Sequence, residues 1–351
     1  MSELSACFNA WIHEGGPSAL VMKDYLEPAA GTGEVIFPPT FAPPKDKKDS
    51  GASYVVDGEG EKSVCLLDSV GSQANRLEPV FKTAPYRDMV PQVEIRVKDR
   101  VVNLLDVGHR AADALVRSTE LAPELEKAFV ACDGGDAEQL AKLAPTSLVF
   151  GAWDSRGSQA KVPRLVDSTV RAFGIKKLSR AAQYFSALEK DEVEELLETD
   201  TQTQRKPLSK AGFLDAPSGL TLGGITVDGN IVRTTIVNLT ALRSLGAATA
   251  ERELALRRYI LGLTLTAAYA PVEFFLRQGC LLVRVAGKPR EVMIVYRDGR
   301  REPFSAPIES IESFAQEAAQ SFGVGTGRSV EFDSKLAKKL LKDASKSKEE
   351  D

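Results

Sequence analysis

Residues 63–79 read Ser-Val-Cys-Leu-Leu-Asp-Ser-Val-Gly-Ser-Gln-Ala-Asn-Arg-Leu-Glu-Pro, and they join a strand pattern directly to a helix pattern. The apolar run 63–67 predicts a buried strand. Asp68 is a suitable N-cap for a helix over 69–78, and Pro79 ends that helix because proline lacks the backbone N–H that a helix interior needs. A short strand followed at once by a capped helix is the unit from which we predict the rest of the fold.

The remaining sequence repeats this mixture of short strands and helices. Strands are expected at 53–56 and 63–67, in hairpins over 93–105, 220–239 and 280–296, and at 148–153, while helices are expected at 106–118, 189–200, 251–269 and 307–322. Antiparallel pairs alternate with helices and show no regular βαβ order, so the pattern favours the α+β class over a doubly wound sheet.

Composition narrows the function classes. The 351 residues are 43% hydrophobic and 27% charged, which suits a soluble chain of one large or two ordinary domains. No apolar run reaches the ~18–20 residues of a membrane span, and the first residues show no charged-then-apolar leader pattern, so a cytoplasmic protein is expected. The four cysteines lie far apart and the only histidines are His13 and His109, so we expect no metal and no cofactor.

Charge is unevenly distributed around a net value of −4. Residues 156–180 hold seven basic side chains and one acidic one, whereas residues 189–200 hold seven acidic side chains and one lysine. These stretches are either two solvated faces that attract each other, or a phosphate-binding surface beside an acidic insertion. Composition does not decide between the two.

The helix predicted at 69–78 carries apolar residues at i, i+4 and i+7, with a polar edge beside them. That edge and its neighbour consist of Ser69, Gln73, Asn75 and Arg76. Arginine binds phosphate through its guanidinium, and amides and hydroxyls bind ribose, so the edge suits an RNA backbone. The alternative is that Gln73 and Asn75 hydrogen-bond neighbouring loop backbone.

Two further segments carry candidate binding residues. The helix predicted at 106–118 presents His109 and Arg110, although its arginines could simply pair with Asp113. The segment Phe-Gly-Ala-Trp-Asp-Ser-Arg-Gly at 150–157, followed by Lys-Val-Pro-Arg at 161–164, places a tryptophan among cations. Trp153 could stack a base while Arg156, Lys161 and Arg164 hold the backbone, or it could be a core residue at a strand end.

Together, the segments at 68–78, 106–115 and 150–164 resemble the backbone subunit of the type I-G (formerly I-U) CRISPR surveillance complex, a branch of the RAMP superfamily. This resemblance covers most of the chain in order. It implies an RNA-recognition-like (ferredoxin-like) palm with inserted finger and thumb elements. It also implies that copies stack head-to-tail along one guide RNA (crRNA) and hold its sugar–phosphate chain, while the guide pairs with target DNA.

The resemblance assigns the RNA path to Ser69, Gln73, Asn75, Arg76, His109 and Arg110, with a second group of Trp153, Arg156, Lys161 and Arg164. Residues 1–334 are expected to form one palm with insertions at 37–52, about 156–215 and about 220–239, the last being a thumb candidate. Residues 335–351 are expected to be a charged, flexible tail. The acidic block is expected to face solvent or another subunit of the complex, and no membrane contact is expected.

Three other functions remain open at this point. The first is a metal-dependent RNase that cuts target RNA with Asp154 or Asp68, although these residues also suit a turn and a helix cap. The second is a nucleotide-binding enzyme built on the glycines at 323–327, which follow a helix and lack a P-loop pattern. The third is a scaffold that binds only protein, which the clustered basic residues disfavour. We expect a non-catalytic subunit.

Overall fold

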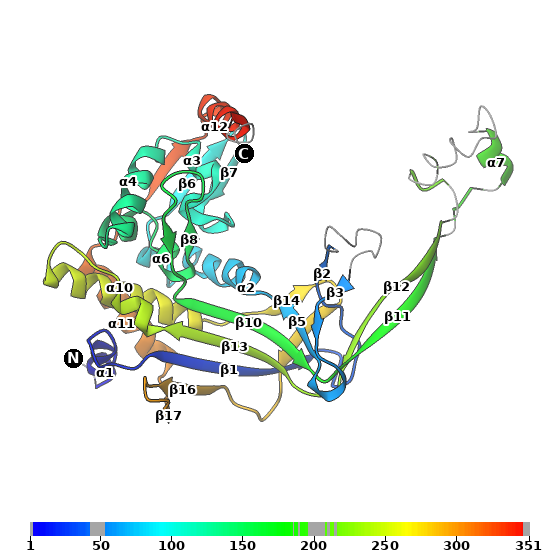
Figure 1. Ribbon diagram of the computed structural model, residues 1–351, viewed down its shortest axis with the longest axis horizontal. Coiled ribbons are helices and arrows are strands. Elements are labelled where there is room, and N and C mark those ends of the chain that lie inside the picture. Colours follow the sequence, from blue (N-terminus) through cyan, green and yellow to red (C-terminus); the bar gives the residue numbers. More distant parts are fainter. Residues whose placement is uncertain are drawn as a thin grey trace.

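The computed structural model describes residues 3–42, 53–184, 186–188, 190–195, 208, 211–213 and 216–346. Strands and helices are intermixed around one large antiparallel sheet, which confirms the α+β class (Figure 1). The architecture is compatible with a ferredoxin-like palm. Residues 43–52, half of the predicted acidic helix at 189–200 (189 and 196–200), and 347–351 lie outside the described part.

The large sheet is built on long central strands that pair antiparallel to one another. Within the described residues it has nine strands in the order β14-β15-β1-β13-β10-β5-β4, with β16 also pairing β1 and β17 pairing β16. Their bounds are β1 Ala19–Pro28, β4 Val56–Asp57, β5 Val64–Asp68, β10 Val166–Phe173, β13 Ile231–Asn238, β14 Phe274–Arg277, β15 Cys280–Arg284, β16 Glu291–Val295 and β17 Arg301–Pro303.

Alternation along these strands separates a buried side of the sheet from an exposed one. In β1, Leu20, Met22 and Asp24 are buried, whereas Lys23, which lies between Met22 and Asp24, is exposed. The register pairs Met22 with Thr235 and Lys23 with Thr234, so each row of cross-strand partners shares one side. The buried rows therefore form one continuous face of the sheet, against which the core packs.

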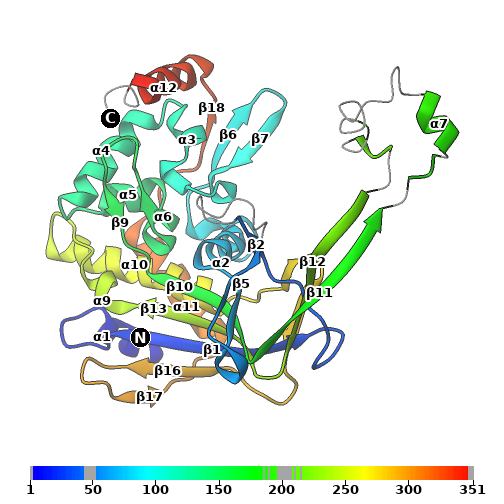
Figure 2. The ribbon, with the colours of Figure 1, turned by 45° about the vertical axis from the view of Figure 1, so that its right-hand side comes forward.

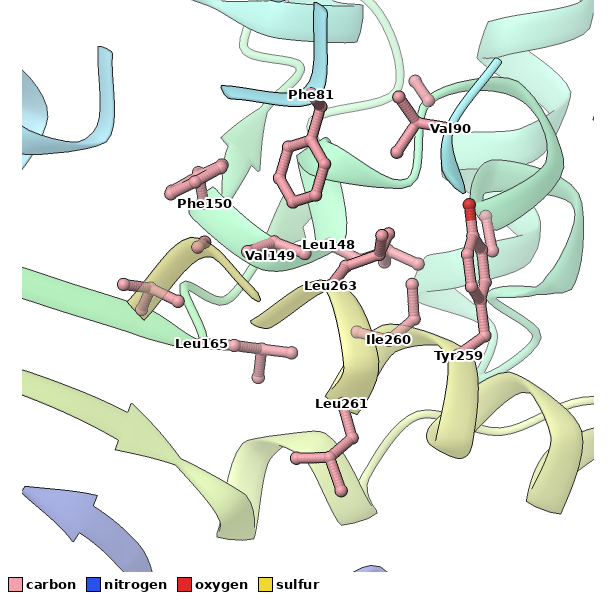
Figure 3. Close-up of a cluster of buried hydrophobic side chains, with 14 of the residues drawn as sticks. Phe81, Val90, Leu148, Val149, Phe150, Leu165, Tyr259, Ile260, Leu261 and Leu263 are labelled. Atoms are coloured by element: carbon pink, nitrogen blue, oxygen red, sulfur yellow. The ribbon is translucent and has the colours of Figure 1, made fainter. Parts of the chain in front are cut away.

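Helices cover the inward side of β1, β13 and β10. They include α1 (Glu3–Trp11), α10 (Ala250–Tyr269) and α11 (Ile308–Phe322). A Cβ atom at Gly262 would lie 2.8 Å from the Cα of Ala315, so glycine is what lets α10 and α11 approach this closely. Tyr259 of α10 donates to the Met89 carbonyl at 2.7 Å and stacks on Phe322. Figure 3 shows Tyr259 in the buried core with Ile260, Leu261 and Leu263 of the same helix.

A second layer of short elements sits on the other side of α10. It contains α4 (Ala122–Asp133), α5 (Glu138–Leu143), α6 (Thr146–Phe150) and the small sheet β18-β6-β7 (Arg328–Glu331, Val93–Val97, Arg100–Asn103). Helix α12 (Ser334–Lys346) packs against this layer near α3 (Ala114–Arg117), as Figure 2 shows. Most of the segment expected as a flexible tail is therefore a helix.

A long two-stranded arm projects from the curled end of the sheet. It consists of β11 (Ile175–Tyr184) and β12 (Ala216–Val227), which pair only with each other among the described strands. Helix α7 (Lys190–Glu195), in the predicted acidic block, lies beyond the far end of the arm (Figures 1 and 2). The acidic helix is thus held away from the basic residues at the base of the arm.

The structure corrects two predicted hairpins. The strands within 220–239 form, but β12 pairs β11 whereas β13 pairs β1 and β10, so they do not pair with each other. Likewise, β15 and β16 both pair β1 at different points along its length. In the first case the turn connects strands of two different sheets, and in the second it connects two strands that pair with different parts of β1. Local sequence cannot distinguish either turn from that of a hairpin.

Other local predictions are confirmed. The pair β6–β7 is an antiparallel hairpin, and helices α10 and α11 begin and end within a residue of the predicted bounds. Strand β4 pairs β5, while β3 (Ser53–Tyr54) pairs β2 (Thr40–Phe41). The remaining short elements are β8 Ala152–Trp153, β9 Lys161–Val162, α2 Val70–Leu77 and α9 Leu239–Arg243.

Candidate nucleic-acid interface

The first predicted segment forms α2 directly after the buried strand β5. Its N-cap is Ser69, whose side chain accepts the Ser72 N–H at 3.3 Å, and not Asp68 as predicted. Asp68 instead ends β5 with its carboxylate buried. Asn75 is exposed, and its amide nitrogen lies 3.8 Å from where a Cβ atom would stand at Gly108. Helix α2 and the second segment are therefore neighbours.

The second segment is not the continuous helix predicted at 106–118. It consists of 3-10 turns at Leu104–Asp106 and Arg110–Ala112 followed by the one-turn helix α3, which Asp113 caps. Arg110 has φ 52°, in the left-handed region, which interrupts a right-handed helix at that residue. The break follows from the tertiary contacts of Arg110.

The buried Arg110 side chain joins all three segments. Its Nε lies 2.7 Å from a Glu78 carboxylate oxygen just beyond α2, and its Nη1 donates to the Gly151 carbonyl at 3.3 Å. The guanidinium also lies 5.2 Å from the centroid of the Phe150 ring. A single cation thus links α2, the 106–118 segment and the 150–164 segment.

The third segment differs from the strand predicted at 148–153. It forms helix α6 and then the short hairpin β8–β9, whose loop is held by the buried Asp154. Asp154 accepts the Ser158 backbone N–H at 2.7 Å and lies 3.4 Å from Arg117. Trp153 is 56% exposed and not a core residue, and the Lys161 ammonium lies 5.0 Å from its ring centroid.

The ten predicted binding residues divide into two groups. The exposed group, available for contact with a ligand, is Asn75, His109, Trp153, Arg156 and Lys161. The second group makes internal contacts and comprises Ser69, Gln73, Arg76, Arg110 and Arg164.

The internal contacts of the second group leave little for a ligand. Gln73 is fully buried and donates to Asp68 at 2.7 Å. Arg76 pairs with Asp68 at 3.0 Å, and Arg164 donates to the Phe150 carbonyl at 2.7 Å. Burial also lowers the pKa of Arg164. These side chains are engaged in internal contacts, although Arg76 keeps 29% of its side chain exposed.

A buried polar chain under the sheet was not anticipated from the sequence. Ser168 on β10 donates to the Gln73 side-chain oxygen at 3.0 Å, and Arg233 on β13 donates to Ser168 at 3.1 Å. Arg233 then pairs with Asp24 on β1, which Arg290 also contacts at 2.8 Å. The available signal was polar residues at inward positions of otherwise alternating strands.

Burial sets the protonation behaviour of two members of these networks. It raises the pKa of Glu78 to about 7, although the neighbouring Arg110 opposes the shift. It lowers the pKa of Arg233 to about 10, against the attraction of Asp24. Arg110–Glu78 and Arg233–Asp24 are therefore desolvated ion pairs, in which removal of one partner would leave the charge of the other buried and unpaired.

The described residues hold no group of three or more His, Cys, Asp and Glu side chains that could bind a metal ion. Both nominated aspartates are engaged: Asp68 contacts Arg76 and Arg277, and Asp154 contacts Arg117. Within the same part of the chain, no helix combines the length and hydropathy needed to cross a bilayer.

The glycines at 323–327 close a packed turn. Gly323 follows α11 with φ 75°, and a Cβ atom on Gly325 would overlap the Lys142 carbonyl. Lys142 donates to the carbonyl of Phe322 at 3.1 Å. Close backbone packing accounts for these glycines without a nucleotide.

The fold and this surface define an α+β protein in which three separated segments form one ordered unit with exposed aromatic, amide and cationic side chains. Residues 20–177 match the family model described as CRISPR-associated protein GSU0053 (Cas_GSU0053). The matched region contains all three segments, so this part of the chain is similar to a CRISPR-associated family. No curated protein matches the chain.

Proposed function

We propose that this chain is a guide-RNA-binding backbone subunit of a type I-G CRISPR surveillance complex. The observation that carries the proposal is the union of the three segments through Arg110, within the region that matches a CRISPR-associated family. In this role the subunit holds the sugar–phosphate chain of the guide, and base pairing by the guide selects the target DNA.

The exposed group supplies chemistry suited to contact that ignores sequence. Trp153 offers a ring face for stacking, and Lys161 beside it offers a cation for phosphate. Asn75 and His109 add hydrogen-bonding groups on the neighbouring segments, and Arg156 adds a second cation. Contacts of these kinds position a nucleic-acid backbone without reading its bases.

The arm of β11 and β12 takes the thumb role that the predicted hairpin at 220–239 would have had. It carries exposed Lys177 at its base, and an exposed Lys176 that pairs with Asp228 at 2.8 Å. Ten to twelve residues per strand at ~3.3 Å each give a reach of roughly 35 Å. Such an arm is long enough to cross the guide–target duplex and contact a neighbouring copy.

Several copies would stack head-to-tail along one guide in the cytoplasm, together with other subunits of the complex. A repeated contact between unlike faces that does not close produces a helical filament. We expect purified protein to carry RNA, seen as a raised 260/280 nm absorbance ratio that nuclease lowers, and to form filaments in electron micrographs. Monomers that ignore added guide would refute the proposal.

The surface itself is tested by a matched pair of variants. Lys161→Ala is expected to weaken binding of two unrelated RNA sequences equally, measured by fluorescence anisotropy. Arg301→Ala removes an exposed arginine from β17, far from the three segments, and is expected to leave affinity unchanged. Equal losses for both variants would mean that binding follows overall charge and not this surface.

The proposed subunit binds RNA and cuts neither guide nor target. Asp68 and Asp154 both neutralise internal arginines, which accounts for their burial without catalysis. The test is incubation of the assembled complex with complementary RNA and Mg²⁺. Cleavage that disappears in an Asp154→Asn variant would replace this proposal with a metal-dependent nuclease.

A further inference from the structure

A cleft of about 420 Å³ opens between α2 and the edge strand β14. Its polar lining comes from Asn75, Arg76 and Glu273, and Phe275 is the aromatic residue among those that line it. Prolines and aliphatic side chains of the segments after α2 and after α10 complete its walls. This volume is within the ~300–1,000 Å³ of small-molecule sites.

Alternation along β14 explains why an aromatic ring lies in the open. Phe274 and Leu276 point into the core, so Phe275 between them points outward and is 53% exposed. An exposed phenylalanine ring contributes little burial of apolar surface to the fold. A ligand that binds in the cleft would remove this ring from water.

Arg76 ties α2 to β14 and thereby builds the cleft. Its Nη1 donates to the Phe275 carbonyl at 3.1 Å, its Nη2 donates to the Leu276 carbonyl, and its Nε pairs with Asp68 at 3.0 Å. These bonds hold α2 against β14 and place the guanidinium beside the Asp68 carboxylate, which Arg277 also contacts at 3.4 Å. The arginine therefore forms a wall of the cleft with its donors engaged in internal contacts.

The remaining groups match the chemistry of a nucleobase. A base has a π face that can stack on Phe275 and a polar edge with donors and acceptors. The Asn75 amide both donates and accepts, and the Glu273 carboxylate accepts from amino and imino groups. Glu273 would repel a phosphate, so the charge of the cleft favours the base over the backbone.

The location of the cleft agrees with this chemistry. Asn75 belongs both to the cleft and to the exposed group of the proposed RNA surface, where it adjoins Gly108. We propose that the cleft receives one unpaired nucleobase of the RNA held on that surface, stacked on Phe275. This inference rests on the proposed function and adds a base-binding site to its backbone contacts.

The experiment measures affinity of the full chain for two probes by fluorescence anisotropy. One probe is a 12-nucleotide oligouridine, and the other is the same backbone with abasic sugars. Phe275→Ala is expected to weaken oligouridine binding by about 5- to 150-fold, the loss of one stacked base, and to leave abasic binding unchanged. Phe275→Trp should keep most of the affinity for oligouridine.

Leu281→Ala is the matched control, because Leu281 is the cross-strand partner of Phe275 on the same face and is 48% exposed but does not line the cleft. It should bind both probes as the unchanged protein does. Circular dichroism of each variant verifies that loss of binding is not loss of fold.

Each outcome supports or overturns the inference. Equal oligouridine affinity for Phe275→Ala and the unchanged protein overturns the base site and leaves the proposed function standing. Equal losses on both probes, or a change in self-association alone, also overturn it and would assign the cleft to backbone or protein contact. If the unchanged protein binds neither probe, the proposed function fails and this inference fails with it.

Discussion

Replacing Arg110 with methionine removes its charge and donors but keeps a long apolar stem in a similar volume. Arg110 and Glu78 are 5% and 1% exposed, so the change leaves a buried carboxylate without its cation. Breaking a buried pair in this way costs about 3–5 kcal/mol. The left-handed φ of 52° at residue 110 adds nothing to the difference in stability between the two proteins, because methionine and arginine both carry a Cβ atom.

The cost of Arg110→Met should depend on pH. Burial raises the pKa of Glu78 to about 7, and an unfolded glutamate titrates near ~4.3. The folded state therefore binds the proton more tightly, so stability from this group is complete below ~4.3 and is lost as pH rises through about 7. Without Arg110 the pKa of Glu78 rises further, so the variant should lose more stability at pH 8 than at pH 6.

Urea unfolding at pH 6 and pH 8, followed by circular dichroism, measures both effects. The double variant Arg110→Met/Glu78→Gln removes both charges and should recover most of the loss at pH 8. The reasoning is refuted if Arg110→Met costs under 1 kcal/mol at pH 8, or if its cost is the same at both pH values.

Trp153→Ala should weaken binding of unrelated RNA sequences equally, by about 1–3 kcal/mol, and Lys161→Ala should reduce the slope of log K against log salt by about 0.7 in a salt titration; losses that vary with sequence would indicate base reading. Burial raises the pKa of Cys65 and Cys280 to about 11, so iodoacetamide at pH 8 should label them only after denaturation, and mass spectrometry that finds rapid labelling of the folded protein would contradict this. Gly325→Ala should cost about 1–3 kcal/mol in thermal unfolding, because its Cβ atom would overlap backbone, and an unchanged Tm would show that the turn has room.

The structure brings the three predicted segments together and separates their predicted residues into exposed and internal ones. Sequence spacing identified α2 and the exposed Trp153, since polarity and Gly-flanked turns are local signals. It could not separate exposed Asn75 from buried Gln73, which lie two residues apart on one helix. That difference depends on Ser168 and Asp68, which approach Gln73 from two strands.

By itself, the sequence determined the α+β class, the hairpin β6–β7 and the helices α10 and α11, because the pattern of each lies within its own residues. Only the tertiary structure decided the pairing of β12 with β11, and the break of the second segment at Arg110. Strand partners are chosen by hydrogen bonds between distant residues. A buried arginine adopts whatever backbone its distant carboxylate and carbonyl partners require.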